Sequence, residues 1–195
     1  LLAPQFGQKF PGAAWRWVEK TPTHANFLEC ILPLYPEAQV LHIVRHPVPA
    51  IASRRSKFPF NRETPLEQLA HAWNRLDENV QRGRALFPGR IFTLRYEDLV
   101  ADVKKELAAV GEFLGAPWDM ERLDLSPSEP GLASLALPSE AWKFSDSTRE
   151  LASTNEAYRG SLPAADVERI ESIVAERMRQ YGYIHFAGPS PEKVT

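Results

Sequence analysis

Short apolar segments alternate along the chain with longer stretches in which apolar residues recur every three or four positions. Residues 39–45 and 90–96 are rich in β-branched and other large apolar side chains, which is typical of buried strands in a parallel sheet. The spacing of apolar residues predicts helices at residues 23–32, 47–55, 64–86, 99–114 and 163–178. Strands that alternate with amphipathic helices predict an α/β fold, with a parallel sheet flanked by helices in three layers.

Prolines and glycines mark the predicted ends of these elements. Pro33 and Pro36 are expected to end the first helix, and Gly115 is expected to end the fourth. The segment 116–161 contains four prolines, so we expect irregular structure that covers the fold.

Composition and charge limit the classes of function. The chain has 195 residues, enough for one domain, which we expect to span residues 1–186 before a flexible tail at 187–195. With 23 basic and 25 acidic side chains the net charge is −2, which argues against nucleic-acid and polybasic membrane partners but permits a local basic pocket.

The sequence shows no signal-peptide pattern, and its apolar runs fall short of the ~20 residues that span a bilayer. Cys30 is the single cysteine, so no intrachain disulfide can form, and a cytoplasmic location is expected. Because the chain begins on leucine rather than methionine, we expect it to be cut from something longer.

The segment with the clearest chemistry follows the first predicted strand. Arg45 stands where that strand ends, and Ser53 lies eight residues on, in the next predicted helix. In a parallel α/β sheet ligands bind at the carboxyl ends of the strands, where a guanidinium and a hydroxyl can hold phosphate oxygens. The alternative is that Arg45 only caps the strand and Ser53 is an ordinary helix residue.

Four blocks of sequence give this segment its context. They are WVEKTPTH at residues 17–24, YPEAQ at 35–39, the segment 41–53, and LRYEDL at 94–99, which precedes FLG at 113–115. In this order the blocks resemble the sulfotransferases that use 3′-phosphoadenosine-5′-phosphosulfate (PAPS), whose fold is related to that of P-loop nucleotide hydrolases. The resemblance runs from about Trp17 to Gly182 and implies transfer of a sulfuryl group from PAPS to a hydroxyl or amine, with adenosine 3′,5′-bisphosphate (PAP) as product.

The resemblance assigns roles to four residues. Arg45 and Ser53 match the residues that bind the 3′-phosphate, and Tyr96 matches the tyrosine that lies against the adenine. Lys20 matches the lysine beside the sulfuryl group. The alternatives are a core position for Tyr96 and a solvated surface position for Lys20.

Lysine suits sulfuryl transfer because this reaction, like phosphoryl transfer, depends on positioning and on cationic stabilisation of spreading negative charge. Lysine and arginine can supply that charge, so no metal is expected. A general base would also help the acceptor. The cytosolic branch of the family has a histidine two places after the lysine, where this chain has Pro22. Glu19 and His24 are therefore the candidates, although each is also an ordinary residue at a helix start.

The chain departs from the family pattern at the phosphate loop. The family binds the 5′-phosphosulfate with a Ser/Gly/Thr-rich turn, and nothing before Trp15 provides such a turn. We therefore expect half of a cofactor site, little activity from this chain alone, and an uncovered apolar strand edge that favours oligomers. The family's basic C-terminal glycine segment is also poorly matched, and Arg159-Gly160 is the candidate for its remnant.

Three classes of function stay open. The first is a sulfotransferase with a small-molecule or carbohydrate acceptor, and the second is a non-catalytic remnant that binds PAP or a protein partner. The third is a P-loop kinase fragment, although neither its glycine-rich loop nor its Mg²⁺ carboxylate is visible. A metal site at His42 and His46 is disfavoured, because the two residues straddle the end of a strand.

Overall fold

A computed structural model describes residues 16, 18–117, 154–158 and 160–186 of the chain. The elements in chain order are the 3-10 helix η1 (Pro22–Phe27), α2 (Leu28–Leu34), β1 (Val40–Val44), α3 (Pro47–Lys57), the 3-10 helix η2 (Pro59–Asn61), α4 (Leu66–Leu86), β2 (Ile91–Arg95), α5 (Tyr96–Ala101), α6 (Val103–Phe113), the 3-10 helix η5 (Glu156–Tyr158) and α8 (Ala164–Gln180). The predicted tail at 187–195 and most of the predicted irregular segment lie outside the described residues.

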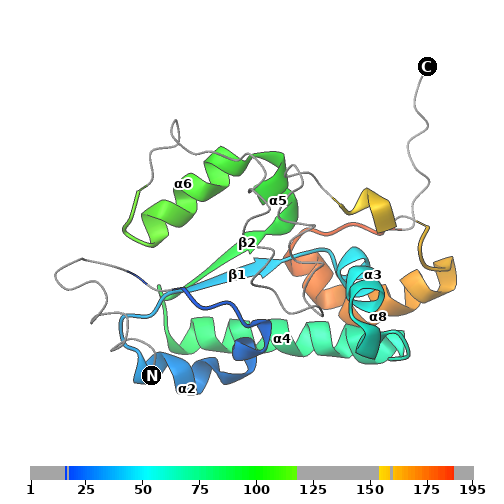
Figure 1. Ribbon diagram of the computed structural model, residues 1–195, viewed down its shortest axis with the longest axis horizontal. Helices are drawn as coiled ribbons and strands as arrows, with labels where there is room; N and C mark the ends of the chain where they lie inside the picture. The colour runs from blue at the N-terminus through cyan, green and yellow to red at the C-terminus, as the bar shows by residue number, and fades with distance from the viewer. Residues whose placement is uncertain (1–15, 17, 118–153, 159, 187–195) are drawn as a thin grey trace, which may run out of the picture.

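The two strands pair side by side and in parallel. The register runs from Val40 opposite Ile91 to Val44 opposite Arg95. Both strands therefore end on the same side of the molecule, where α3 and α5 begin (Figure 1). The predicted parallel arrangement is confirmed.

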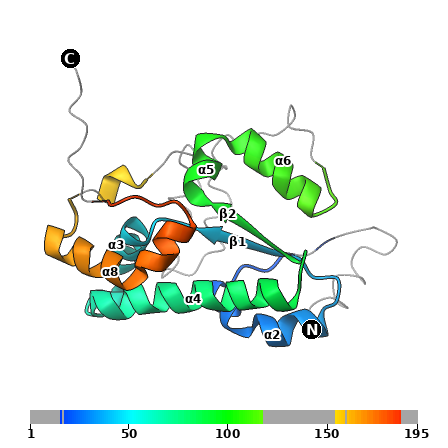
Figure 2. The ribbon, with the colours of Figure 1, turned by 180° about the vertical axis from the view of Figure 1, so that it is seen from behind.

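Helices lie on both faces of the sheet, as predicted. In Figures 1 and 2, α5 and α6 lie on one side, and α4 runs along the other with α2, α3 and α8 beside it. The ring of Phe113 on α6 lies 5.4 Å from that of Phe92 on β2, so α6 packs directly on the sheet. The result is the three-layer α/β architecture expected from the sequence.

The main core lies between α3, α4 and α8. It contains Val44, Val48, Ile51, Leu66, Leu69, Ala70, Val167, Ile170, Val174 and Met178, with Tyr183 and Phe186 from the stretch after α8. Trp73 packs against this cluster and is partly buried. A smaller core joins α2, α4 and β2 through Leu28, Leu32, Val80 and Ile91.

Asp77 is a charged residue inside this packing, with 2% of its surface exposed. Arg177 of α8 forms an ion pair with it, 3.2 Å from Nε to Oδ2, and the Tyr181 hydroxyl donates to its other oxygen. Burial, together with the hydrogen bond to Asp77, raises the pKa of Tyr181. The buried carboxylate is thereby paired, as its desolvation requires, and it ties α4 to α8.

Two predicted helices differ in the structure. The first begins as the 3-10 helix η1, and Phe27, at the turn from η1 into α2, is 55% exposed. The predicted helix at 99–114 is divided into α5 and α6 at Asp102, whose backbone is extended. The Asp102 carboxylate accepts a hydrogen bond from the Lys105 amide and so starts a new helix, as aspartate does at N-caps.

The prediction that β1 is a buried strand is only partly correct. Val44 is buried, but Leu41 and Ile43 are 43% and 57% exposed. These two side chains alternate with the inward-facing residues of β1 along one face of the strand. One face of β1 is therefore left apolar and partly open.

None of the helices in the described residues is long and apolar enough to cross a membrane.

Ile170 provides a test of the main core, because its side chain is fully buried between α4 and α8. We expect Ile170→Ala to lower the free energy of unfolding by ~2–5 kcal/mol, through lost burial and the cavity that the change leaves. Urea denaturation followed by circular dichroism measures the loss. Ile184→Ala is the matched control, because that side chain is 83% exposed. Equal losses in the two variants would contradict this account of the core.

Candidate functional site

Arg45 lies between the end of β1 and the start of α3, at the edge where both strands finish. Its Nε donates to Oδ1 of Asn155 at 2.7 Å, and its Nη2 donates to the Thr154 hydroxyl at 3.1 Å. Both partners are neutral and come from the segment before η5. The guanidinium is thus held in place without direct pairing to an acid.

Two tyrosine rings flank the same guanidinium. Its central carbon lies 4.7 Å from the centre of the Tyr96 ring and 5.5 Å from that of Tyr158. Cations are attracted to aromatic faces at such distances, so the rings help to stabilise a partly buried charge. Burial lowers the pKa of Arg45, while the neighbouring tyrosines and Glu97 act in the opposite direction. Arginine stays protonated in proteins, so the site holds a positive charge.

The remaining donors of Arg45 are available to a ligand. Within the part of the chain that the structure describes, no carboxylate forms an ion pair with Arg45, and its Nη1 donates to no acceptor. A guanidinium presents five N–H groups in a planar fork that matches the oxygens of a phosphate. The donors present at this edge of the sheet therefore fit a phosphate group.

The carboxylate of Glu97, in the first turn of α5, is hydrogen-bonded to residues beside Arg45. Oε1 accepts hydrogen bonds from the His46 amide at 3.0 Å and from Nδ2 of Asn155 at 2.8 Å. Oε2 accepts from the Tyr183 hydroxyl at 3.0 Å. Burial by itself raises the pKa of Glu97, but these hydrogen bonds outweigh it and the pKa is lowered. Glu97 is therefore held as a carboxylate.

His46 joins the site to the start of α3. Its Nδ1 accepts a hydrogen bond from the Val48 amide at 3.3 Å, and its Nε2 lies 2.9 Å from the Ile184 carbonyl oxygen. A carbonyl can only accept, so Nε2 is the protonated nitrogen and the ring is neutral. Burial lowers the pKa of His46, and the rings of Tyr183 and Phe186 each lie 5.1 Å away.

Of the residues predicted to bind the nucleotide, the structure brings Arg45 and Tyr96 into contact. The Tyr96 hydroxyl also accepts a hydrogen bond from the Thr154 amide at 3.1 Å, which ties the ring to the segment before η5. Ser53 is partly buried in α3, and its carbonyl oxygen accepts from the Ser56 hydroxyl at 3.0 Å. No hydrogen bond joins Ser53 to Arg45 among the described residues, so their common role stays a prediction.

The predicted catalytic residues form a second, exposed group before and within η1. Nδ1 of His24 lies 2.7 Å from a carboxylate oxygen of Glu19, and the Thr21 hydroxyl donates to the other oxygen at 2.5 Å. Lys20 is exposed beside them and forms no ion pair among the described residues. The structure thus joins Glu19 to His24 and leaves the Lys20 ammonium open to solvent.

Thr154, Asn155, Tyr158 and Glu97 were not predicted from the sequence to belong to a site. The first three lie in the proline-rich region expected to be irregular cover, where apolar spacing has no information about contacts. Glu97 stands inside the YEDL block, but only Tyr96 of that block was singled out. The one available signal was the neighbouring Arg159-Gly160 pair, whose Gly160 adopts a positive φ of 76°.

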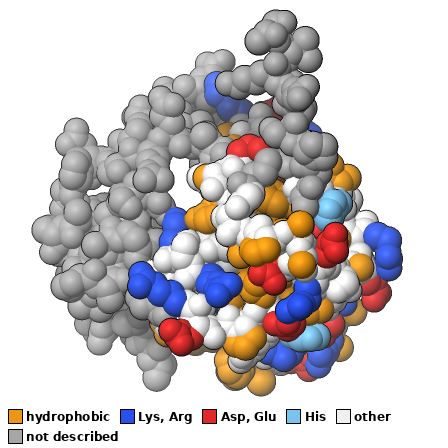
Figure 3. Space-filling model, turned by 90° about the vertical axis from the view of Figure 1, so that its right-hand side faces the viewer, with side chains coloured by type: hydrophobic (Ala, Val, Ile, Leu, Met, Phe, Trp, Pro, Cys, Tyr) orange, Lys and Arg blue, Asp and Glu red, His pale blue; other side chains and the backbone are white. Residues whose placement is uncertain are grey.

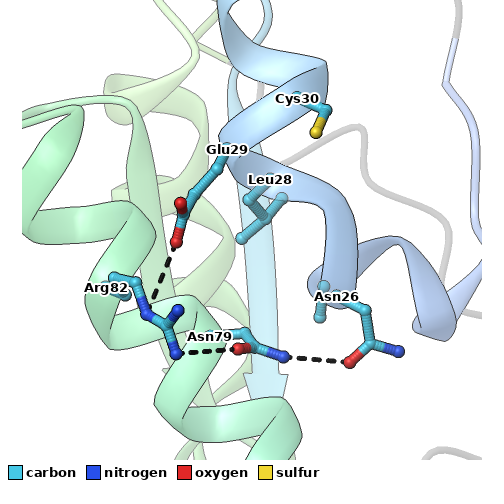
Figure 4. Close-up of a pocket in the computed structure, with 7 residues that line it drawn as sticks. Asn26, Leu28, Glu29, Cys30, Asn79 and Arg82 are labelled. Carbon is cyan, nitrogen blue, oxygen red and sulfur yellow. Dashed lines mark hydrogen bonds and ion pairs between the residues drawn. The ribbon is translucent and has the colours of Figure 1, made fainter.

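No group of three or more potential metal ligands occurs among the described residues. A separate polar hollow of about 190 Å³ lies between the η1–α2 region and α4 (Figure 4). The Arg82–Glu29 ion pair and the hydrogen bond from Asn79 to Asn26 cross it. None of the predicted site residues lines it. Around α3 and α8, basic and acidic side chains are interspersed on the described surface (Figure 3).

Comparison with known proteins identifies the family. Residues 3–120, more than half of the chain, match the model of the Sulfotransferase family. The chain belongs to the sulfotransferase family. The sulfotransferase domain from the curacin biosynthetic pathway has the same fold, with a TM-score of 0.63 and 22% sequence identity over 94% of this chain and 67% of that one.

Two curated relatives of this sulfotransferase-family chain match about half of it. The omega-hydroxy-beta-dihydromenaquinone-9 sulfotransferase Stf3 of Mycobacterium tuberculosis is 29% identical over 111 residues, which are 49% of this chain and 28% of that protein. An uncharacterized protein of Aquifex aeolicus is 26% identical over 110 residues, or 53% of this chain and 14% of that protein. The matched region is thus well under a third of either relative's length.

The buried neutral His46 makes stability depend on pH. Because its pKa is lowered in the fold, the unfolded chain takes up a proton first as pH falls below the ordinary value of about 6.5. We expect the free energy of unfolding to fall between pH 7.5 and 5.5, and His46→Gln to reduce that slope. Urea titrations at several pH values measure it.

Burial also lowers the pKa of His42, so some slope of the same sign is expected to remain in His46→Gln. His71→Gln is the control, because His71 is exposed on α4. A slope as steep in His46→Gln as in the unchanged chain would contradict the role given to His46.

Proposed function

We propose that this chain contains the 3′-phosphate-binding part of a sulfotransferase that uses PAPS. The observation that supports this most strongly is the Arg45 guanidinium. It is partly buried at the carboxyl ends of two parallel strands, is held by neutral partners and is unpaired with any described acid. A charge desolvated in this way, with donors to spare, favours a bound anion.

The sulfotransferase family and fold of the chain support PAPS as the anion that binds at Arg45. We propose that the 3′-phosphate binds the Nη1 side of Arg45, with the Ser53 hydroxyl as a further donor from α3. Because Arg45 lies against the Tyr96 ring, an adenine bound at that ring would lie close to the group proposed to bind the 3′-phosphate. PAP, which keeps the 3′-phosphate after transfer, should bind the same groups.

The exposed group at η1 supports a role in the transfer itself. When PAPS is bound it supplies an activated sulfuryl group, and Lys20 would stabilise the negative charge that develops on the oxygens around it. Glu19 lies against Nδ1 of His24, which favours the tautomer with a proton on Nδ1. Nε2 of His24 would then be free to take a proton from an acceptor hydroxyl or amine. This scheme needs no metal.

The acceptor is a separate question. The name of the Mycobacterium tuberculosis relative gives omega-hydroxy-beta-dihydromenaquinone-9 as the acceptor of that protein. For this chain we propose a small-molecule or carbohydrate acceptor with a hydroxyl or amine, and a cytoplasmic location. The chain's net charge of −2 suits such a partner better than it suits a nucleic acid.

Arg45→Ala tests the nucleotide site. Truncating one side of a desolvated charge pair should weaken PAP binding by ~2–5 kcal/mol. Isothermal titration calorimetry with PAP measures the change. Arg169→Ala is the control, because Arg169 is exposed on α8 and pairs with Glu67. Equal PAP affinity in Arg45→Ala and the unchanged chain would remove Arg45 from the proposal.

Lys20→Ala tests the transfer step. Loss of a charge that acts on the transferring group should lower the rate ~10²–10³-fold and leave PAP affinity nearly unchanged. Transfer from labelled PAPS to phenols, alcohols and amines measures the rate, in a protein that includes any sequence upstream of Leu1. Lys104→Ala on α6 is the control. A protein that binds PAP but transfers nothing would be the non-catalytic remnant, and an unaltered rate in Lys20→Ala would exclude Lys20.

A further inference from the structure

Asn155 stands between the positive and the negative group of the site. Its Oδ1 accepts from Nε of Arg45 at 2.7 Å, and its Nδ2 donates to Oε1 of Glu97 at 2.8 Å. Arg45 follows β1, Asn155 precedes η5, and Glu97 lies in the first turn of α5. One buried amide therefore connects three segments of the chain.

The orientation of this amide is determined by its two neighbours. A carboxylate can only accept a hydrogen bond and a guanidinium can only donate. If the amide were reversed, its oxygen would face Glu97 and its NH₂ group would face Arg45, and both contacts would become repulsive. Glu97 thus determines that an acceptor oxygen points at Arg45.

The neutral amide leaves the charge of Arg45 available. A carboxylate in direct contact would accept two parallel bonds from the guanidinium and neutralise it. Asn155 occupies only Nε, and Thr154 takes one N–H of Nη2. Glu97 therefore orients the guanidinium without competing for the donors that a phosphate would use.

The same carboxylate also holds the backbone next to Arg45. Oε1 of Glu97, which receives Asn155, accepts the His46 amide as well. That amide belongs to the residue before α3, the helix that contains Ser53. One oxygen of Glu97 therefore positions both the side chain of Arg45, through Asn155, and the start of α3, through the His46 amide. This holds the two predicted phosphate ligands, Arg45 and Ser53, in a fixed arrangement.

We propose that Asn155 and Glu97 are positioning residues for the 3′-phosphate, with Asn155 orienting the Arg45 guanidinium and Glu97 orienting Asn155. This inference rests on the proposed function, because it takes Arg45 as the phosphate ligand. Neither residue touches the phosphate itself.

Asn155→Ala tests the inference by the selectivity of nucleotide binding. Titration calorimetry compares PAP with adenosine 5′-monophosphate, which lacks the 3′-phosphate. We expect Asn155→Ala to lose about tenfold or more in PAP affinity, the effect of one hydrogen bond to a charged group, with little change for the monophosphate. Asn79→Ala on α4 removes an amide of the same kind away from the site and should bind both nucleotides as the unchanged chain does.

Glu97 is tested by a pair of variants. Glu97→Ala removes the acceptor for Asn155, and its PAP affinity should fall at least as far as that of Asn155→Ala. Glu97→Gln keeps an oxygen for Nδ2 of Asn155 and should restore most of the loss. If Glu97→Ala does not fold, the PAP and monophosphate affinities of Asn155→Ala decide whether the inference holds.

These outcomes distinguish failure of the inference about Asn155 and Glu97 from failure of the proposed function. Equal losses for PAP and the monophosphate in Asn155→Ala would show a general structural role and overturn the inference. A PAP affinity unaltered in Asn155→Ala but reduced in Arg45→Ala would also overturn it while leaving the proposed function intact. If Arg45→Ala itself binds PAP normally, the proposed function fails first.

Discussion

The site depends on one partly buried carboxylate, that of Glu97. Glu97 accepts hydrogen bonds from the His46 amide, the Asn155 side chain and the Tyr183 hydroxyl, which belong to three segments far apart in the sequence. A partly buried carboxylate is costly unless such donors surround it, and the donors in turn need an acceptor away from water. Because each partner satisfies another, the β1–α3 junction, the segment before η5 and the stretch after α8 are held together at the ends of the strands.

This arrangement explains why Arg45 can be positioned and still remain reactive toward anions. Its charge is stabilised by two tyrosine faces and by neutral oxygen atoms, while the nearest acid acts through an intervening amide. The low local dielectric strengthens any interaction between the remaining donors and a phosphate. A direct ion pair would have made the same residue a structural one.

Much of the fold could be predicted from the pattern of apolar residues. Both strands, their parallel pairing and the helices from α3 to α8 follow from spacing that each segment shows by itself. The break at Asp102 was missed because a local side-chain bond to the Lys105 amide overrides a continuous apolar period. The exposure of Leu41 and Ile43 was missed because composition shows that a strand is apolar, but not which face is covered.

The site was predictable only in part, for a related reason. Arg45 and Tyr96 stand in blocks with a recognisable order, and the structure places the guanidinium over the ring. Asn155 lies 110 residues from Arg45 in a segment without periodicity, so its contact with Arg45 depends on the tertiary fold alone. Glu97 stands next to a residue that was identified, yet its role is visible only once its three donors are in place.

The most direct test of the account is a crystal structure of the chain with PAP. The account predicts the 3′-phosphate within hydrogen-bond distance of Arg45 on its Nη1 side, with Nε still bonded to Asn155. PAP bound elsewhere on the molecule, or with its 3′-phosphate turned away from Arg45, would contradict it.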